Sequence, residues 1–238
     1  MSTKLIVALD FTNERQTLAF LNSLNTRECA VKIGSELFTR CGPKFVQKIV
    51  AQEFKVFLDL KFHDIPQQVA NACKAAADLG VWMLSLHALG GVRMMLAAKE
   101  AIALTSSSQG VKGRPLLIAV TVLTSMDETE YENLGMQYSL SNEVKHLAQL
   151  AQSSGLDGVV SSAFEVQSIK QCCGENFLSI TPGIRLANDK HDDQARVFTP
   201  QEAIKAGSDF LVIGRSITKS KNPTQVIHKI LQVCGNAI

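Results

Sequence analysis

The sequence predicts a single-domain TIM (β/α)8 barrel that spans residues 1–238. Eight short β-branched runs alternate with amphipathic helical stretches along the 238 residues, and such alternation implies parallel strands joined by right-handed crossovers. Eight strand–helix units in a chain of this size favour a closed barrel over an open sheet. Because no internal repeat, low-complexity tract or linker interrupts the pattern, we expect no domain boundary.

The expected strands are the runs richest in apolar and β-branched residues. In chain order they are 4–9, 29–34, 55–60, 82–88, 115–123, 158–163, 177–183 and 209–215. Helical patterns lie between them, for example at 69–80, where Gly80 is the expected C-cap. The polar stretch 186–198 follows a strand, so we expect it to lie over the carboxyl-terminal end of the barrel, where barrel enzymes have their active sites.

Composition indicates a globular protein with a sizeable core. Hydrophobic residues make up 46% of the chain, charged residues 19%, and the formal net charge is +2. No run of Lys and Arg offers a nucleic-acid surface, and no apolar run is long enough for a signal peptide or a membrane span. We therefore expect a cytoplasmic protein with no nucleic-acid or membrane partner.

The cysteines indicate neither a metal site nor a disulfide framework. None of the six has a second cysteine or a histidine at metal-binding spacing, and Cys172 and Cys173 are adjacent, which disulfide scaffolds rarely use. We expect free thiols in a reducing compartment.

Charged residues gather at the ends of the first three expected strands. Because side chains alternate along a strand, the apolar face of 55–60 should pack under the helices and turn Asp59 and Lys61 into the barrel. The same alternation turns Asp10 and Lys32 inward. These four charges could form structural salt bridges or a functional array. A charge array in a low-dielectric barrel mouth is costly unless it has a use, so we favour the functional interpretation.

Three polar residues close to this array have simpler interpretations. Asp64 lies just before Pro66 at the start of an expected helix, so it could be the N-cap. His63 and His87 are interpreted as polar packing residues and assigned no chemistry. No cluster of carboxylates and histidines has metal-ligand spacing, so we expect no metal site.

The last two expected strands carry an anion-binding pattern. "TPGIR" (181–185) and "IGRSI" (213–217) place a glycine beside an arginine in the loops after strands seven and eight, which are the usual phosphate site of barrel enzymes. Glycine lets backbone N–H groups approach the anion, and arginine supplies charge-assisted hydrogen bonds. The residues concerned are Gly183, Arg185, Gly214 and Arg215.

The motifs "LIVALD", "VKIG", "DLKFHDIP", "VTVLTS", "TPGIR" and "IGRSIT" occur in this order along essentially the whole chain. In this set the chain resembles the orotidine 5′-phosphate decarboxylase family, which makes UMP in pyrimidine biosynthesis. "DLKFHDIP" is the most specific motif, since D-x-K-x-x-D alone also marks sister barrels. The resemblance implies a homodimer with two active sites at the subunit interface and no metal or organic cofactor.

The resemblance also implies roles for individual residues. Lys61 would be the proton donor within a charged network with Lys32 and Asp59, and Asp64 would reach the site of the partner subunit. Asp10, with Lys32 nearby, would bind the ribose hydroxyls. The remaining implied contacts are Thr124 or Ser125 for the pyrimidine, and Arg185, Gln194, Gly214 and Arg215 for the phosphate. Gln68 stands where many bacterial relatives have a threonine that contacts substrate from the partner subunit.

The implied chemistry explains why charge gathers at the end of a core strand. Loss of CO2 from C6 of the pyrimidine leaves an electron pair on carbon, which the Lys61 ammonium could stabilise and then protonate, while the aspartates keep the lysines charged and oriented. Two alternatives remain. One is a Mg²⁺-dependent sister barrel acting on sugar phosphates, such as a 3-keto-gulonate-phosphate decarboxylase or a hexulose-phosphate synthase. The other is a non-catalytic nucleotide-binding barrel.

Overall fold

The computed structural model describes residues 4–103, 105, 114–186 and 198–235, which form a closed barrel of eight parallel strands. Each strand pairs with the next one in the chain, and β8 pairs with β1. The predicted barrel is confirmed, and every strand falls within or close to its expected run. The strands are β1 (Leu5–Ala8), β2 (Ala30–Gly34), β3 (Val56–Phe62), β4 (Met83–His87), β5 (Leu116–Val120), β6 (Gly158–Val160), β7 (Leu178–Thr181) and β8 (Phe210–Ile213).

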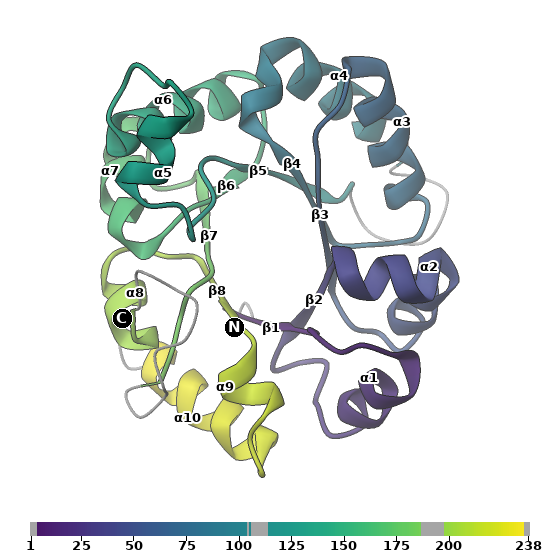
Figure 1. Ribbon diagram of the computed structural model, residues 1–238. Helices are drawn as coiled ribbons and strands as arrows, with labels where there is room; N and C mark the ends of the chain where they lie inside the picture. Colours follow the sequence, from purple (N-terminus) through teal and green to yellow (C-terminus); the bar gives the residue numbers. More distant parts are fainter. Residues whose placement is uncertain (1–3, 104, 106–113, 187–197, 236–238) are drawn as a thin grey trace.

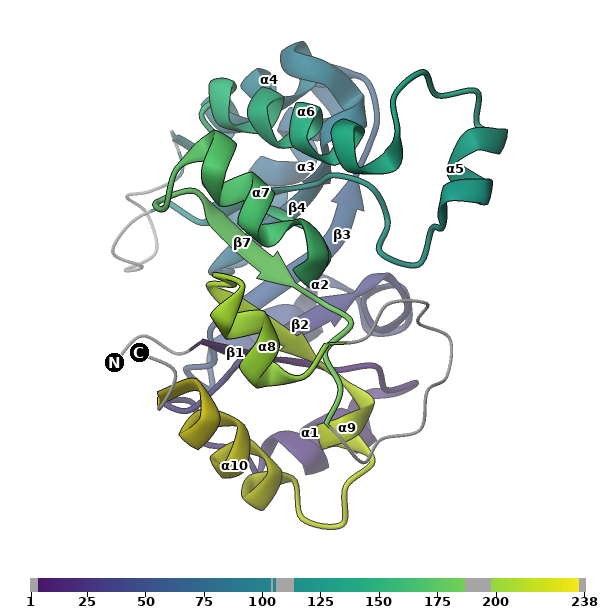
Figure 2. The same ribbon diagram turned by 90° about the vertical axis from the view of Figure 1, so that its left-hand side faces the viewer.

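Helices surround the ring of strands (Figure 1). In the perpendicular view, the short helix α5 projects beyond the barrel on the side toward which the strand arrows point (Figure 2). The helices are α1 (Glu14–Leu21), α2 (Ser35–Val50), α3 (Pro66–Ala77), α4 (Gly91–Ala103), α5 (Glu128–Asn133), α6 (Leu140–Ser153), α7 (Ala163–Cys173), α8 (Pro200–Lys205), α9 (Arg215–Thr218) and α10 (Pro223–Gly235), with a 3₁₀ turn, η1, at Ala88–Gly90.

The alternation of side chains along the strands divides the apolar residues into two cores. Val56 and Leu58 of β3 belong to the large core between strands and helices, whereas Phe57 belongs to the smaller core inside the barrel. On β1, Val7 faces the outer core and Ile6 the inner one. The predicted orientation of these strands is therefore confirmed, and the inner core forms the floor beneath the charged barrel mouth.

Helix α3 differs from the sequence prediction at both ends. Its N-cap is Ile65, which is held in an extended conformation before Pro66, so Asp64 lies one residue too early to be the N-cap. The Asp64 carboxylate instead accepts a hydrogen bond from the Ile65 N–H at 2.6 Å. At the other end the C-cap is Asp78 rather than Gly80, which has a positive φ of 81° in the turn that follows.

Strand β3 contains a bulge at the point where its charged residues begin. Leu58 pairs with Leu84 and Phe62 pairs with Leu86, so the three intervening residues of β3 lie opposite one residue of β4. Lys61 lies within this bulge and has a φ of 52°, which is uncommon for a residue with a side chain. Lys61 nonetheless lines the pocket with Phe57 and Asp59, while Leu60 and Phe62 pack against the outer core. The predicted alternation of β3 therefore holds through the bulge, which gives Lys61 an unusual backbone conformation.

The cysteines of the described chain are free thiols, as expected from their spacing. Within the same residues, the structure contains no helix that is long and apolar enough to cross a membrane.

Candidate active site

A pocket of about 300 Å³ opens at the carboxyl ends of the strands, a volume within the range of small-molecule sites. Its floor is the inner core, represented by Phe57, Ile180 and Val212. Its wall includes most of the residues that the sequence singled out. These are Asp10, Lys32, Asp59, Lys61, Thr124, Gly183, Arg185, Gly214 and Arg215.

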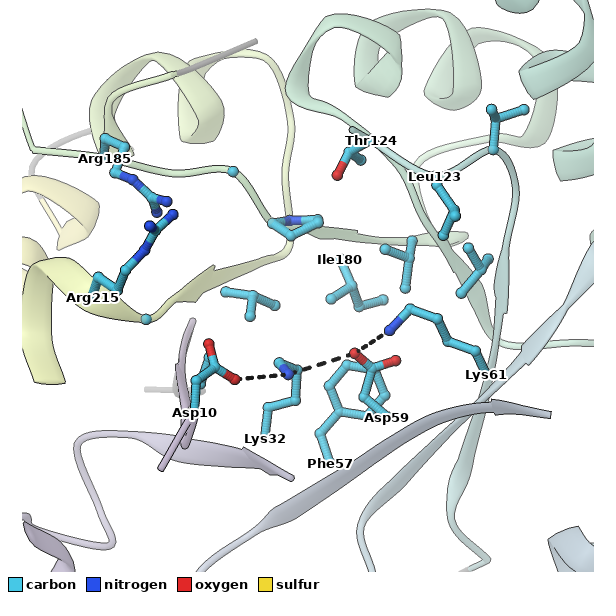
Figure 3. A pocket seen from close by; sticks show the side chains of 18 residues that line it. Asp10, Lys32, Phe57, Asp59, Lys61, Leu123, Thr124, Ile180, Arg185 and Arg215 are labelled. Carbon is cyan, nitrogen blue, oxygen red and sulfur yellow. Dashed lines mark hydrogen bonds and ion pairs between the residues drawn. The ribbon is translucent and has the colours of Figure 1, made fainter. Parts of the chain in front are cut away.

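Acidic and basic side chains alternate across one side of this pocket (Figure 3). The Lys32 Nζ lies between two carboxylates, 3.7 Å from Asp10 Oδ1 and 3.7 Å from Asp59 Oδ2. The Lys61 Nζ donates a hydrogen bond to the same Oδ2 atom of Asp59 at 2.8 Å. The structure thus brings the four predicted charges from three adjacent strands into one chain of ion pairs.

Asp59 lies at the centre of these ion pairs and is the most buried of the four residues, with 6% of its surface exposed. Burial alone would raise the pKa of the Asp59 carboxyl, but the charges of Lys32 and Lys61 and the hydrogen bonds from Lys61 and Ser85 outweigh it and hold that pKa below its ordinary value. Asp59 is therefore a carboxylate at neutral pH. A fixed negative charge in the barrel mouth keeps two ammonium groups within 4 Å of it.

Ser85 is a site residue that the sequence analysis did not assign. Its hydroxyl donates to Asp59 Oδ1 at 2.8 Å and accepts the backbone N–H of Lys61 at 2.9 Å. Its inward orientation follows from strand alternation, but its partners depend on the bulge in β3, which the residue pattern does not reveal.

Two glycines leave room for the charged side chains. A Cβ atom on Gly34 would lie 3.2 Å from Lys32 Nζ, and one on Gly214 would lie 3.3 Å from Asp10 Oδ2. Both contacts are tighter than ordinary van der Waals distances, so a larger residue at either position would displace the charge beside it. Gly214 had been predicted for phosphate binding, and this close approach to Asp10 adds a second reason for glycine there.

Two arginines occupy the opposite side of the pocket, where their guanidinium groups point toward one another (Figure 3). Arg185 follows β7, and Arg215 begins α9 directly after β8. The Arg185 Nη1 also donates to the Ile184 carbonyl at 3.2 Å. Guanidinium groups that converge on one region provide charge-assisted hydrogen bonds to an anion, and the two lie in the predicted loops.

Three of the predicted site residues that the structure describes do not line the pocket. Asp64 and Gln68 are exposed on the connection to α3 and on α3 itself, and Ser125 is exposed next to Thr124, which does line the pocket. Thr124 is therefore the better placed of the two candidates for the pyrimidine. Gln194 and most of the predicted loop 186–198 lie outside the described residues.

The two histidines beside the site pack against each other. The rings of His63 and His87 have centroids 5.4 Å apart. Burial, followed by electrostatic interactions with His63 and Lys61, lowers the pKa of His87, so its ring is neutral at neutral pH. In the part of the chain that the structure describes, no group of three or more His, Cys, Asp or Glu side chains could hold a metal ion.

Comparison with known proteins gives matches along nearly the whole chain. A family model described as "Orotidine 5'-phosphate decarboxylase / HUMPS family" matches residues 3–230. The chain is 58% identical over 232 residues to orotidine 5'-phosphate decarboxylase of Legionella pneumophila (strain Paris), which covers 98% of this chain and 99% of that relative. The protein of the same name from Psychromonas ingrahamii is 52% identical, covering 95% of each chain. A crystal structure of orotidine 5'-phosphate decarboxylase from Lactobacillus acidophilus superposes with a TM-score of 0.87 at 36% identity, covering 98% of this chain and 99% of that one.

Proposed function

The chain belongs to the orotidine 5′-phosphate decarboxylase / HUMPS family and is a decarboxylase of pyrimidine biosynthesis, and from this premise we propose how its pocket converts orotidine 5′-monophosphate to UMP and CO2. Relatives that are 50% to 58% identical over almost the full chain carry the name of this decarboxylase, which argues against the Mg²⁺-dependent sugar-phosphate alternative. The observation that carries the mechanism is the Lys61 ammonium, held 2.8 Å from the buried carboxylate of Asp59 in the pocket wall.

The arginine side of the pocket is the proposed phosphate site. Arg185 and Arg215 would hold the phosphate through charge-assisted hydrogen bonds, with Gly214 allowing the substrate to approach the backbone and Gln194 adding an amide. Because the phosphate does not react, its binding energy is available to hold the pyrimidine in the reactive position. Substrate recognition and chemistry therefore occupy opposite sides of one pocket.

The side of the pocket formed by the alternating acidic and basic residues is where we propose that the reaction takes place. Asp10 and Lys32 would bind the ribose hydroxyls, Thr124 would bind the pyrimidine, and C6 of the ring would face Lys61. The bond between C6 and its carboxylate carbon breaks, CO2 leaves, and the electron pair stays on C6. The Lys61 ammonium stabilises this carbanion and then transfers a proton to C6, which gives UMP. No metal or organic cofactor takes part in this sequence.

Asp59 has two proposed effects on that step. Its ion pairs hold Lys61 and Lys32 in place before the substrate binds, so the positive charge needs no rearrangement as the carbanion forms. Its own negative charge would also lie near the carboxylate that leaves as CO2, and the two like charges would repel each other in the ground state. Both effects depend on Asp59 being ionised.

A homodimer would complete the site. Five exposed apolar side chains lie beside Asp64 on the connection after β3, on η1 and α4, and after β5, and the last of them, Leu123, lines the pocket. They are Ile65, Leu89, Val92, Leu96 and Leu123, with exposures of 64%, 47%, 39%, 41% and 40%. Isolated exposed apolar residues are ordinary, but a group on neighbouring elements favours an interaction surface. We propose that a second copy covers it and that each subunit lends Asp64 and Gln68 to the other's pocket.

The remaining features of the proposal follow from the sequence. The barrel is one domain, and the protein works in the cytoplasm without nucleic-acid or membrane partners.

The first test is the ultraviolet absorbance of orotidine 5′-monophosphate mixed with the purified protein in EDTA. We expect turnover in EDTA by the parent chain and a loss of at least about 10⁴-fold in kcat for Lys61→Ala, because both the acid and the fixed cation are removed. UMP binding should persist in the variant. Lys55→Ala is the matched control, since Lys55 precedes the same strand at its opposite end.

Three results would contradict this assignment. Activity that EDTA abolishes and Mg²⁺ restores would favour the metal-dependent alternative. UMP binding without any turnover by the parent chain would favour a non-catalytic barrel. Substantial residual activity of Lys61→Ala would remove Lys61 as the acid.

The phosphate role of Arg215 can be separated from a structural role by changing the substrate as well as the protein. Hydrogen bonds to charged groups contribute about 1.5–3 kcal/mol, so Arg215→Ala should lower kcat/KM for the nucleotide roughly 10²-fold. With orotidine, which lacks the phosphate, the same variant should match the parent chain. The exposed neighbour Lys219 provides the control Lys219→Ala. An equal penalty with both substrates would show that Arg215 does not act through the phosphate.

The position of Asp64 across a dimer interface can be tested by mixing inactive subunits. If Asp64 serves the partner's site, a heterodimer of Lys61→Ala and Asp64→Ala subunits contains one site with both residues intact. Random exchange of subunits in a symmetric dimer should then restore about a quarter of the parent activity. If Asp64 instead acts in its own subunit, no site is complete and the mixture should stay inactive.

A further inference from the structure

Ser85 of β4 joins the two residues on which the proposed chemistry depends. It is fully buried, with 0% of its surface exposed. Its hydroxyl donates to Asp59 Oδ1 at 2.8 Å and accepts from the backbone N–H of Lys61 at 2.9 Å. A hydroxyl has one donor hydrogen, and here that hydrogen goes to the carboxylate that anchors the charge array.

The acceptor side of Ser85 compensates for the bulge in β3. Where three residues of β3 lie opposite one residue of β4, the regular ladder of backbone hydrogen bonds is interrupted. The N–H of Lys61 would otherwise lack a partner at this position, and an unsatisfied buried N–H costs about 1–3 kcal/mol. The hydroxyl of Ser85 takes the place of a strand carbonyl and holds Lys61 in its positive-φ conformation.

Because the Ser85 hydroxyl donates to one oxygen of the Asp59 carboxylate, the two oxygens have different partners. Oδ1 accepts from Ser85, whereas Oδ2 faces Lys61 at 2.8 Å and Lys32 at 3.7 Å. Rotation of the carboxylate would break both arrangements together. The Ser85 bond therefore fixes which oxygen faces the ammonium groups and, through Asp59, where the Lys61 Nζ lies.

We propose that Ser85 is a positioning residue for the decarboxylation, which sets the rotation of the Asp59 carboxylate and the backbone of Lys61 without contacting the substrate. This inference rests on the proposed function of Lys61. It also gives the bulge a function, since the Lys61 N–H that the bulge frees from the strand ladder bonds to the serine that orients Asp59.

Loss of the hydroxyl should change the pH profile in a defined direction. The titratable groups around Asp59 are Lys32 on β2, Lys61 on β3, His87 on β4 and, beyond Lys32, Asp10 after β1. Ser85 provides one of the hydrogen bonds that lower the pKa of Asp59. Without it that pKa rises toward its ordinary value. Because the proposal requires ionised Asp59, the acid limb of kcat should move to higher pH.

The test compares Ser85→Ala and Ser85→Thr with the parent chain, measuring kcat, KM and UMP affinity across acidic pH. Misplacement of reacting groups can cost on the order of 10²-fold, and we expect a kcat loss of about this size in Ser85→Ala with UMP affinity nearly unchanged. Ser85→Thr keeps the hydroxyl and should recover most of the rate. If Ser85→Ala does not fold, Ser85→Cys keeps the volume with a much weaker donor and should show the same loss.

Ser179→Ala is the matched control. Ser179 is also a fully buried strand serine, but its hydroxyl has no hydrogen-bond partner among the described residues. Its removal should leave kcat and the acid limb unchanged.

Two results would overturn the role of Ser85. One is an active Ser85→Ala variant with the parent kcat and acid limb. The other is a loss of kcat with an unmoved acid limb, which a simple packing defect would produce. A parent chain without decarboxylase activity would instead remove the proposed function, and this inference with it.

Discussion

The ion pair between Asp59 and Lys61 is the interaction on which the rest of the site depends. A carboxylate as buried as Asp59 is unfavourable by itself, and it stays ionised because Lys32, Lys61 and Ser85 all interact with its charged form. The barrel supplies the required positions, since β2, β3 and β4 each carry one of these groups to the same end of the pore. Apolar side chains of the inner core fill the barrel interior beneath these charged groups and form the floor of the pocket.

The same geometry explains how recognition and chemistry share one pocket. The arginines follow β7 and β8, whereas the alternating charges come from β1, β2 and β3. In a closed barrel β8 is the neighbour of β1, so Gly214 lies next to Asp10 although it is far from it in sequence. In the proposed mechanism a phosphate held on one side thus presents the reacting carbon to a cation fixed on the other, and the barrel walls keep the distance between them constant.

The sequence predicted the barrel and most of the pocket because both depend on simple periodicities. Alternation along the strands correctly turned Asp59 and Lys32 inward, and the order of the strands placed Arg185 and Arg215 together. What the sequence did not reveal depends on local backbone geometry. The bulge at Lys61, whose backbone N–H bonds to Ser85, arises from the registers of two strands. The same limit applies to α3, where Pro66 forces Ile65 to be extended and so moves the helix start past Asp64.

The most direct test of the central claim uses the product. If the Lys61 ammonium stabilises a carbanion at C6, the reverse proton transfer must follow the same path. UMP incubated with the parent chain in D2O should therefore lose its H6 signal in the proton NMR spectrum as deuterium replaces it. With Lys61→Ala the signal should remain. A parent chain that decarboxylates the nucleotide but leaves H6 in place, or a Lys61→Ala variant that exchanges H6 as fast as the parent, would contradict the account.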